Sequence, residues 1–166
     1  DPDSAADIRQ RHGAAKVIVT TNTFNHIGDL HRFMRGVDRL LADGGTFVIE
    51  VPRAKELIEH NEFDNIYHEH VSEFSLLSLV RLGGFFGLEV TDVHRLPQIH
   101  GGSMRVFLRR SAAKPFIAPI VAEMLDEEAA GGMLDANTYD ALAARVENIG
   151  AELRRILAGL KAQGLK

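Results

Sequence analysis

The fold is decided by residues 15–51, which contain AKVIVT at 15–20, DLHRFMRGVDRLL at 29–41 and TFVIEV at 46–51. The first and last runs are rich in β-branched residues and predict buried parallel strands. The middle run has apolar residues at helical spacing and starts with Asp29, a good N-cap. Asp43-Gly44-Gly45 is expected to stop this helix. The order strand, helix, strand predicts a right-handed βαβ unit in an α/β fold.

Working outward, the pattern predicts two further strands, at 88–96 and 103–109, joined by the loop PQIHGG. This loop is too short for a crossover helix, so the two strands should form an antiparallel hairpin. Helices are expected at 4–12, 54–60, 75–86, 116–130 and 138–163. The last of these carries apolar residues close to a heptad stripe, which suits packing on the sheet or on another subunit.

Composition limits the classes of function. The chain has 166 residues, 45% hydrophobic and 25% charged, with a formal net charge of -4, so no basic surface for nucleic acid is expected. The absence of Cys excludes disulfides and thiolate metal sites in this chain and suits a cytoplasmic protein. We expect no membrane span and no signal peptide. Because the first residue is Asp1 and not Met, we expect a trimmed N-terminus or a fragment.

The most informative polar stretch is NEFDNIYHEHVSEFS at 61–75, which places Tyr67, His68, Glu69 and His70 together. A phenol, two imidazoles and a carboxylate are costly to keep unless they meet water or a ligand. Such groups can do proton chemistry near neutral pH. Clusters of titratable groups also tend to mark functional sites.

Three other segments should converge with this stretch. In an open parallel sheet, ligands bind outside the carboxyl ends of the strands. The predicted strands end at 20–22 and 50–52, and the hairpin loop at 98–102 lies at the same edge. Its paired glycines, Gly101 and Gly102, would let the backbone approach a ligand closely and offer N–H groups to an anion. This topology predicts one site at this edge of the sheet.

Each candidate also has an alternative interpretation. His70 can be a helix N-terminal histidine bonded to the backbone, and the two glycines can simply make a hairpin turn. His68 and His70 have metal-ligand spacing on an extended segment, and His100 is a third possible ligand. No carboxylate-rich metal motif accompanies these histidines, so we predict no metal site.

Four segments together resemble the sugar C-methyltransferases, namely TTNTFNHIGDL, GGTFVIEVP, NEFDNIYHEHVSEFSL and GLEVTDVHRLPQIHGGSMRV. The resemblance covers about residues 4–110. It implies an enzyme that uses S-adenosylmethionine to methylate C3 of a nucleotide-linked 4-keto-deoxysugar. It also implies a fold: the C-terminal half of a Rossmann-like class I methyltransferase domain, with parallel strands and an antiparallel hairpin, followed by long helices.

The family has three parts: a zinc-binding N-terminal domain, a central methyltransferase domain and a C-terminal domain that helps to hold the sugar nucleotide. By this resemblance, residues 1–111 are part of the central domain and residues 112–166 are a helical segment that leads to the C-terminal domain. The glycine-rich motif, the ribose-binding acidic residue and the zinc-binding cysteines of the family are not found in this chain. Zinc is therefore expected only in a domain outside these residues. Glu73 stands where the family commonly has an aromatic residue.

The resemblance also implies roles for individual residues. His70 would be the base that removes the C3 proton, with Glu69 and Tyr67 orienting it or stabilising the enolate oxygen. The sugar nucleotide would be bound by His68, His100, Gly101, Gly102, Ser103 and Arg105. The methionine end of the cofactor would face Thr21, Asn22 and His26.

Two other classes of function remain open from the sequence. One is a metal-dependent hydrolase that uses His68, His70 and His100. The other is a non-catalytic fragment or interaction module that associates through its C-terminal helices. With the family's glycine-rich strand missing, Val17, Ile18 and Val19 are expected to line an unpaired sheet edge. The isolated chain should then bind S-adenosylmethionine weakly or not at all.

Overall fold

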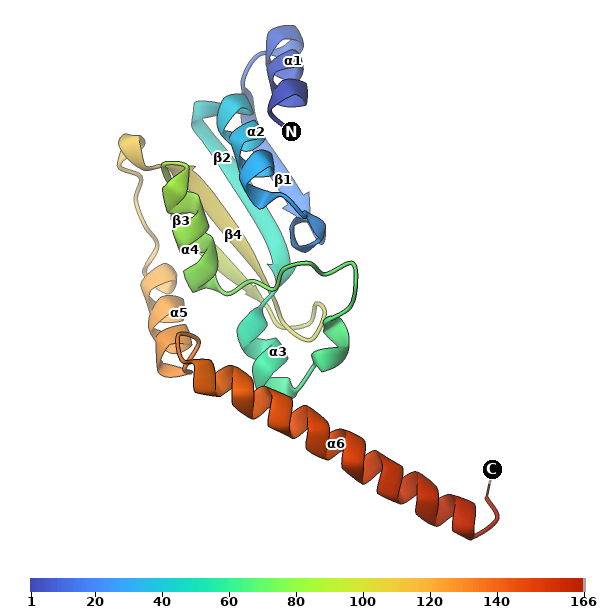
Figure 1. The fold of residues 1–166 in the computed structure, drawn as a ribbon. Helices are drawn as coiled ribbons and strands as arrows, with labels where there is room; N and C mark the ends of the chain where they lie inside the picture. Colours follow the sequence, from blue (N-terminus) through green and yellow to red (C-terminus); the bar gives the residue numbers. More distant parts are fainter. Residues whose placement is uncertain (166) are drawn as a thin grey trace.

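The computed structural model describes residues 1–165, built around a four-stranded sheet of order β1-β2-β4-β3 (Figure 1). Strand β1 (Ala15–Thr21) runs parallel to β2 (Leu41–Pro52). Strand β4 (Ser103–Arg110) pairs antiparallel with β2 on one side and with β3 (Leu88–Leu96) on the other. The predicted α/β fold, with two parallel strands and an antiparallel hairpin, is confirmed.

Helices α2 and α4 begin close to the predicted positions because the sequence supplies side chains that cap them. The Asp29 carboxylate accepts a hydrogen bond from the Arg32 N–H, and Ser75 and Ser78 form a reciprocal capping box. The helices are α1 (Pro2–His12), α2 (Leu30–Leu40), α3 (Ala54–His60), α4 (Leu76–Phe85), α5 (Pro119–Ala130) and α6 (Ala136–Ala162), with short 3₁₀ turns η1 (Phe24–His26), η2 (Phe63–Asn65) and η3 (Ser111–Ala113).

Two predicted boundaries were wrong. Helix α2 ends at Leu40, and Asp43-Gly44-Gly45 lies within β2 instead of stopping the helix. A Cβ at Gly45 would lie 2.9 Å from the Ala15 carbonyl oxygen, so glycine permits this close approach between β1 and β2. Helix α5 begins at Pro119 and not at 116, because proline fixes φ and lacks an N–H, which suits the first turn of a helix.

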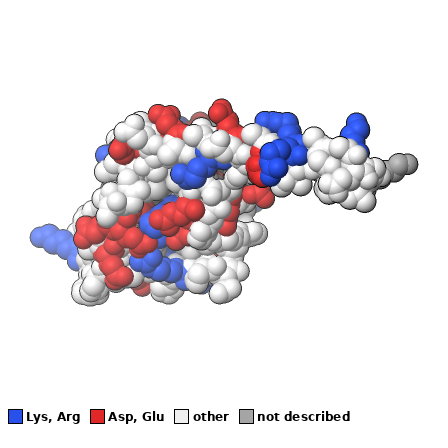
Figure 2. Space-filling model, turned by 90° about the horizontal axis from the view of Figure 1, so that it is seen from below, with Lys and Arg blue, Asp and Glu red and all other residues white. Residues whose placement is uncertain are grey.

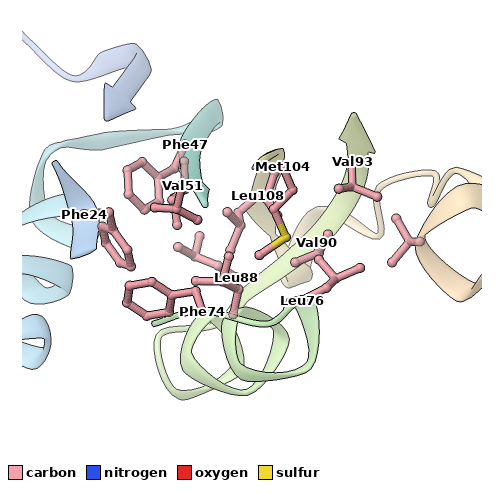
Figure 3. Close-up of a cluster of buried hydrophobic side chains, with 14 of the residues drawn as sticks. Phe24, Phe47, Val51, Phe74, Leu76, Leu88, Val90, Val93, Met104 and Leu108 are labelled. Atoms are coloured by element: carbon pink, nitrogen blue, oxygen red, sulfur yellow. The ribbon is translucent and has the colours of Figure 1, made fainter. Parts of the chain in front are cut away.

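The core lies between one face of the sheet and helices α2, α4 and α5 (Figure 3). Phe24 is completely buried, and its ring centroid lies 5.8 Å from that of Phe33, 6.1 Å from Phe47 and 5.1 Å from Phe74. Aromatic pairs at these separations contribute beyond their buried area. Phe24 thereby anchors η1, the turn that follows β1 at the carboxyl edge of the sheet.

Strand β1 pairs only with β2 among the described residues, and its apolar side chains are partly uncovered. Val17 is 59% exposed and Val19 56% exposed, as expected for an open edge. Ile18 lies on the same edge strand, but its side chain is half-buried and packs against the core. Alternate residues of a strand face opposite sides of the sheet, and Ile18 lies on the covered side.

Helix α6 projects away from the rest of the molecule after packing against α3 (Figure 1). Leu142 is buried near α3, whereas Leu153 is 54% exposed and Leu160 40% exposed. Association through this helix stays a prediction, which sedimentation at several protein concentrations can test. On the face shown in Figure 2, acidic and basic side chains are interspersed. Within residues 1–165, no helix is both long and apolar enough to cross a membrane.

Candidate active site

A cavity of about 150 Å³ opens at the carboxyl ends of β1 and β2. Its walls come from four separate segments of the chain: the turn after β1, the end of β2, the segment 61–75 and the hairpin loop. The lining residues are Asn22, Asn25, His26, Pro52, Asn65, Tyr67, His70 and His100. The convergence that topology predicts is therefore present, and it brings five of the predicted site residues to one cavity.

The backbone fixes two of these residues in unusual conformations. Asn22 has φ 48° and His100 has φ 47°, both in the left-handed region that most residues avoid. The Asn22 N–H donates to the Glu50 carbonyl at 3.0 Å, which ties the turn after β1 to β2. Strained backbone of this kind is often found at ligand sites, where the surrounding fold holds it in place.

His70 lies in an aromatic cage within the cavity wall. Its side chain is only 9% exposed, and its ring centroid lies 4.2 Å from that of Tyr67 and 5.0 Å from that of His26. The backbone N–H of His70 donates to the backbone carbonyl of Tyr67 at 2.9 Å, so a tight turn brings the two rings together. This packing restricts the imidazole to one orientation, as a positioned base requires.

Glu73, which the sequence analysis did not assign to the site, is the carboxylate next to His70. Its Oε1 lies 3.4 Å from His70 Nδ1, and its side chain is 20% exposed. Burial raises the pKa of the Glu73 carboxyl, while the neighbouring His70 ring acts in the opposite direction. The imidazole ring therefore favours the charged form of this carboxyl group, against the effect of burial.

His68 and Glu69 point away from this arrangement. The His68 side chain is 88% exposed and that of Glu69 is 57% exposed, with 3.9 Å between His68 Nε2 and Glu69 Oε1. Neither residue lines the cavity. Of the predicted cluster of four residues, His68 and Glu69 thus point outward, and Tyr67 and His70 line the cavity.

The segment His100 to Ser103 is divided in a similar way. His100 lines the cavity with His70, whereas the next three residues line a second pocket of about 310 Å³ beside Arg53 and Arg95. Gly101 has φ 70° and Gly102 has φ 139°, so the turn itself requires glycine at both positions. The Ser103 hydroxyl donates to the Ile99 carbonyl at 3.0 Å. These contacts favour a structural role for the three residues.

Two further predicted residues lie outside the cavity lining. Arg105 on β4 faces Glu50 on β2, and its Nε donates to Glu50 Oε2 at 2.8 Å. Thr21 ends β1 and is exposed, and its carbonyl accepts a hydrogen bond from the Thr23 hydroxyl. Arg105 is therefore already paired with a carboxylate on the sheet.

A buried ion pair fixes the segment that carries His70 to the rest of the protein. Arg53 Nε donates to Glu128 Oε1 at 2.8 Å, and the side chains are 1% and 0% exposed. The Glu128 carboxylate also accepts the N–H groups of Leu76 and Leu77, at 3.0 and 2.9 Å, at the start of α4. A carboxylate in this position satisfies helix N–H groups that have no partner within the helix. We call Arg53 and Glu128 the buried clamp.

The metal-dependent hydrolase, which the sequence left open as an alternative, finds no support in the geometry. In residues 1–165 there is no group of three or more His, Cys, Asp or Glu side chains that could hold a metal ion. His68 points to the outside, so His68, His70 and His100 do not surround one point.

Three polar residues at the site were not predicted from the sequence: Asn25 and Asn65, which line the cavity, and Glu73 beside it. Asn25 is 2% exposed, and its Oδ1 has no hydrogen-bond partner. Its place next to His26 in the turn after β1 was an available signal. Glu73 was noted only as a departure from the aromatic residue of the family, although it lies three positions after His70.

Comparison with known proteins agrees with this architecture. Residues 1–93 match the family model described as a methyltransferase domain, and residues 98–166 match the C-methyltransferase C-terminal domain. The chain belongs to the methyltransferase domain family. It is 44% identical over 158 residues to the C-methyltransferase NovU of Streptomyces niveus, across 95% of this chain and 37% of that protein. The chain thus spans just over a third of the length of this relative.

Solved structures with similar folds are more distant. A SAM-dependent methyltransferase from Anabaena variabilis is 16% identical, with a TM-score of 0.48 over 66% of this chain and 54% of that one. The mitomycin 7-O-methyltransferase MmcR is 19% identical, with a TM-score of 0.46 over 58% of this chain and 30% of that one.

Proposed function

We propose that this chain supplies the base and part of the cofactor site of an S-adenosylmethionine-dependent C-methyltransferase. The proposed reaction methylates C3 of a nucleotide-linked 4-keto-deoxysugar. The observation that carries the proposal is the cavity in which Tyr67, His70 and His100 meet the turn after β1. The family match and the C-methyltransferase relative support the class of reaction.

The first chemical step is removal of the C3 proton. C3 is adjacent to the C4 ketone, so the electron pair of the broken C–H bond moves into an enolate. His70, held by the ring of Tyr67 at 4.2 Å, takes the proton. The Tyr67 hydroxyl is available as a hydrogen-bond donor to the enolate oxygen, where negative charge develops. Glu69 was expected to share this role, but its exposed position suits a contact with bound substrate better.

The cofactor supplies an electrophilic methyl group that the C3 carbanion accepts. Asn22 and His26 are the residues of this chain that would hold its methionine end, beside Thr21 at the end of β1. The unpartnered Oδ1 of the buried Asn25 fits this assignment, because an acceptor in this place suits an ammonium group. Substrate atoms would contact His100. The exposed His68, and the partly exposed Arg105 beside its partner Glu50, would reach parts of the nucleotide beyond the cavity. The turn formed by Gly101, Gly102 and Ser103 would hold His100 in place.

The proposed function is tested on the complete protein that contains these residues. The enzyme is incubated with S-adenosylmethionine carrying a labelled methyl group and with nucleotide-linked 4-keto-deoxysugars. We expect a sugar product that gains one labelled methyl group, bonded to C3. A label on an oxygen or nitrogen atom, or no transfer to any keto sugar, would contradict the proposal.

A further inference from the structure

We infer that Glu73 is a positioning residue for His70 and holds the proton of the neutral imidazole on Nδ1. This inference rests on the proposed function for its role in the reaction, although the contact itself does not depend on it. Glu73 Oε1 lies 3.4 Å from His70 Nδ1, and both side chains are largely buried. Neither atom has a hydrogen-bond partner in the structure, so at 3.4 Å the two groups are in contact without a formed hydrogen bond. Leaving two buried polar atoms unpaired is costly, so we expect a small rotation of the side chains to close this contact into a hydrogen bond.

The protein backbone keeps the Glu73 carboxylate in this place. Phe74 is 5% exposed and forms a bridge with Arg53 at the end of β2. The Ser75 hydroxyl caps α4 by accepting the Ser78 N–H at 3.1 Å. Because the residues that follow Glu73 are fixed in this way, its side chain is directed toward the loop that carries His70.

The surroundings of His70 leave Glu73 as the group that decides the tautomer. The rings of Tyr67 and His26 pack against the imidazole at 4.2 and 5.0 Å, and neither carries a negative charge there. His100 lines the same cavity, and the Glu69 carboxylate lies beside His68. A carboxylate next to one imidazole nitrogen favours the N–H form of that nitrogen.

The consequence for the reaction follows from the shape of the ring. With the proton on Nδ1, the lone pair of Nε2 is free to face the cavity and to take the C3 proton. The C–H bond breaks, an Nε2–H bond forms, and the electron pair remains on the substrate as the enolate. The resulting imidazolium then has a carboxylate beside it, as a positively charged intermediate requires. Glu73 therefore both selects the basic nitrogen and stabilises the charged ring.

The direct test is the tautomer of His70, read from long-range proton–nitrogen NMR correlations of this chain at a pH where the ring is neutral. The His70 signals are assigned with the His70→Asn variant. We expect the Nδ1–H form in the parent, and a shift toward the Nε2–H form in Glu73→Leu. The matched control is Glu69→Gln. It removes the carboxylate of the residue directly before His70, which points outward beside His68, and should leave the tautomer unchanged. An Nε2–H form in the parent would overturn the inference.

Glu73→Gln keeps the size of the side chain. It therefore provides a second reading of the tautomer if Glu73→Leu does not fold. The amide weakens the contact without opening a cavity, so we expect a smaller shift in the same direction. In the complete enzyme, Glu73→Gln should slow exchange of the C3 proton about tenfold or more, the scale found for residues that orient a functional histidine. If the Glu73 variants shift the tautomer but His70→Asn does not slow exchange of the C3 proton, the proposed function is wrong and the contact between Glu73 and His70 is still supported. An unchanged tautomer in both Glu73 variants would defeat the inference alone.

Discussion

Two histidine–carboxylate pairs on the same loop differ in almost every physical respect. His68 and Glu69 are 88% and 57% exposed, whereas His70 and Glu73 are 9% and 20% exposed. We call His68 and Glu69 the outward pair, which is screened by water, and His70 and Glu73 the inward pair. His70 lies at the cavity wall against two aromatic rings, and Glu73 lies behind it. Electrostatic contacts are stronger where water is excluded. Residue type alone therefore does not distinguish the two histidines, whereas burial does, and the buried one is the residue that we propose as the base.

The difference arises from the turn at residues 67–70. The hydrogen bond from the His70 N–H to the Tyr67 carbonyl closes a tight turn, so Tyr67 and His70 lie on the same side. The two residues between them, His68 and Glu69, occupy the corner of the turn and face outward. The buried clamp of Arg53 and Glu128 then holds the end of this segment at the start of α4.

The largest effect on stability is expected from breaking the buried clamp. Glu128→Ala leaves Arg53 buried without its main partner and two helix N–H groups unsatisfied, so the free energy of unfolding should fall by about 3–5 kcal/mol. Urea unfolding followed by circular dichroism measures the change. The inward pair should loosen with it, and the His70 ring signals should broaden or shift. If Glu128→Ala lowers the free energy of unfolding no more than the control variant Glu127→Gln does, the clamp does not hold this segment.

The matched control is Glu127→Gln, one residue earlier on α5. Its carboxylate is 32% exposed and pairs mainly with Arg95, whose hydrogen bond lowers the pKa of Glu127 to about 2. Its contact with the clamp is weaker, with 3.5 Å between Glu127 Oε1 and Arg53 Nη1. We expect a loss of about 1 kcal/mol at neutral pH, as for a partly exposed pair. A depressed pKa stabilises the fold above the unfolded value of 4.5, and this stability is lost as the pH falls toward 2. The difference between parent and variant in urea unfolding should therefore shrink between pH 4.5 and pH 2, and a constant difference would refute the assignment.

Glu73→Gln should change stability in the opposite direction with pH. Burial raises the pKa of Glu73 above 4.5, so the neutral carboxyl fits the fold better than the charged one. The parent loses this stability as the pH rises through the raised pKa. Relative to the parent, Glu73→Gln should be more stable at pH 7 than at pH values below 4.5, as measured by thermal unfolding. A relative stability that falls with rising pH would mean that the pair with His70 outweighs the cost of burial.

The smallest effects are expected in the outward pair. His68→Asn and Glu69→Gln remove exposed side chains with few contacts, so each should change the free energy of unfolding by less than about 0.5 kcal/mol. Chemical unfolding of both variants at pH 7 checks this. A loss as large as that of Glu127→Gln from either variant would end the contrast between the two pairs.

The sequence predicted the fold well where the signal was local. The β-branched runs, the Asp29 cap and the short hairpin loop each determine their own element, and all three were confirmed. Topology also brought Asn22, His70 and His100 to one edge, as the structure has them. The direction in which each side chain points was not predictable, because it depends on one turn and on packing between distant segments. The buried clamp joins residues 75 positions apart, so no local sequence pattern predicts it.

The most direct test of the account compares His70→Asn with His68→Asn in the complete enzyme. The measured quantity is the rate at which the C3 proton of the keto sugar exchanges with deuterium from the solvent, which reports deprotonation without methyl transfer. With saturating keto sugar, we predict that His70→Asn slows exchange by about a hundredfold to ten-thousandfold, the usual contribution of a positioned base. Under the same conditions His68→Asn should leave exchange nearly unchanged, because a contact with the nucleotide affects substrate affinity and not the removal of the proton. Undiminished exchange in His70→Asn, or an equal loss in His68→Asn, would contradict the account.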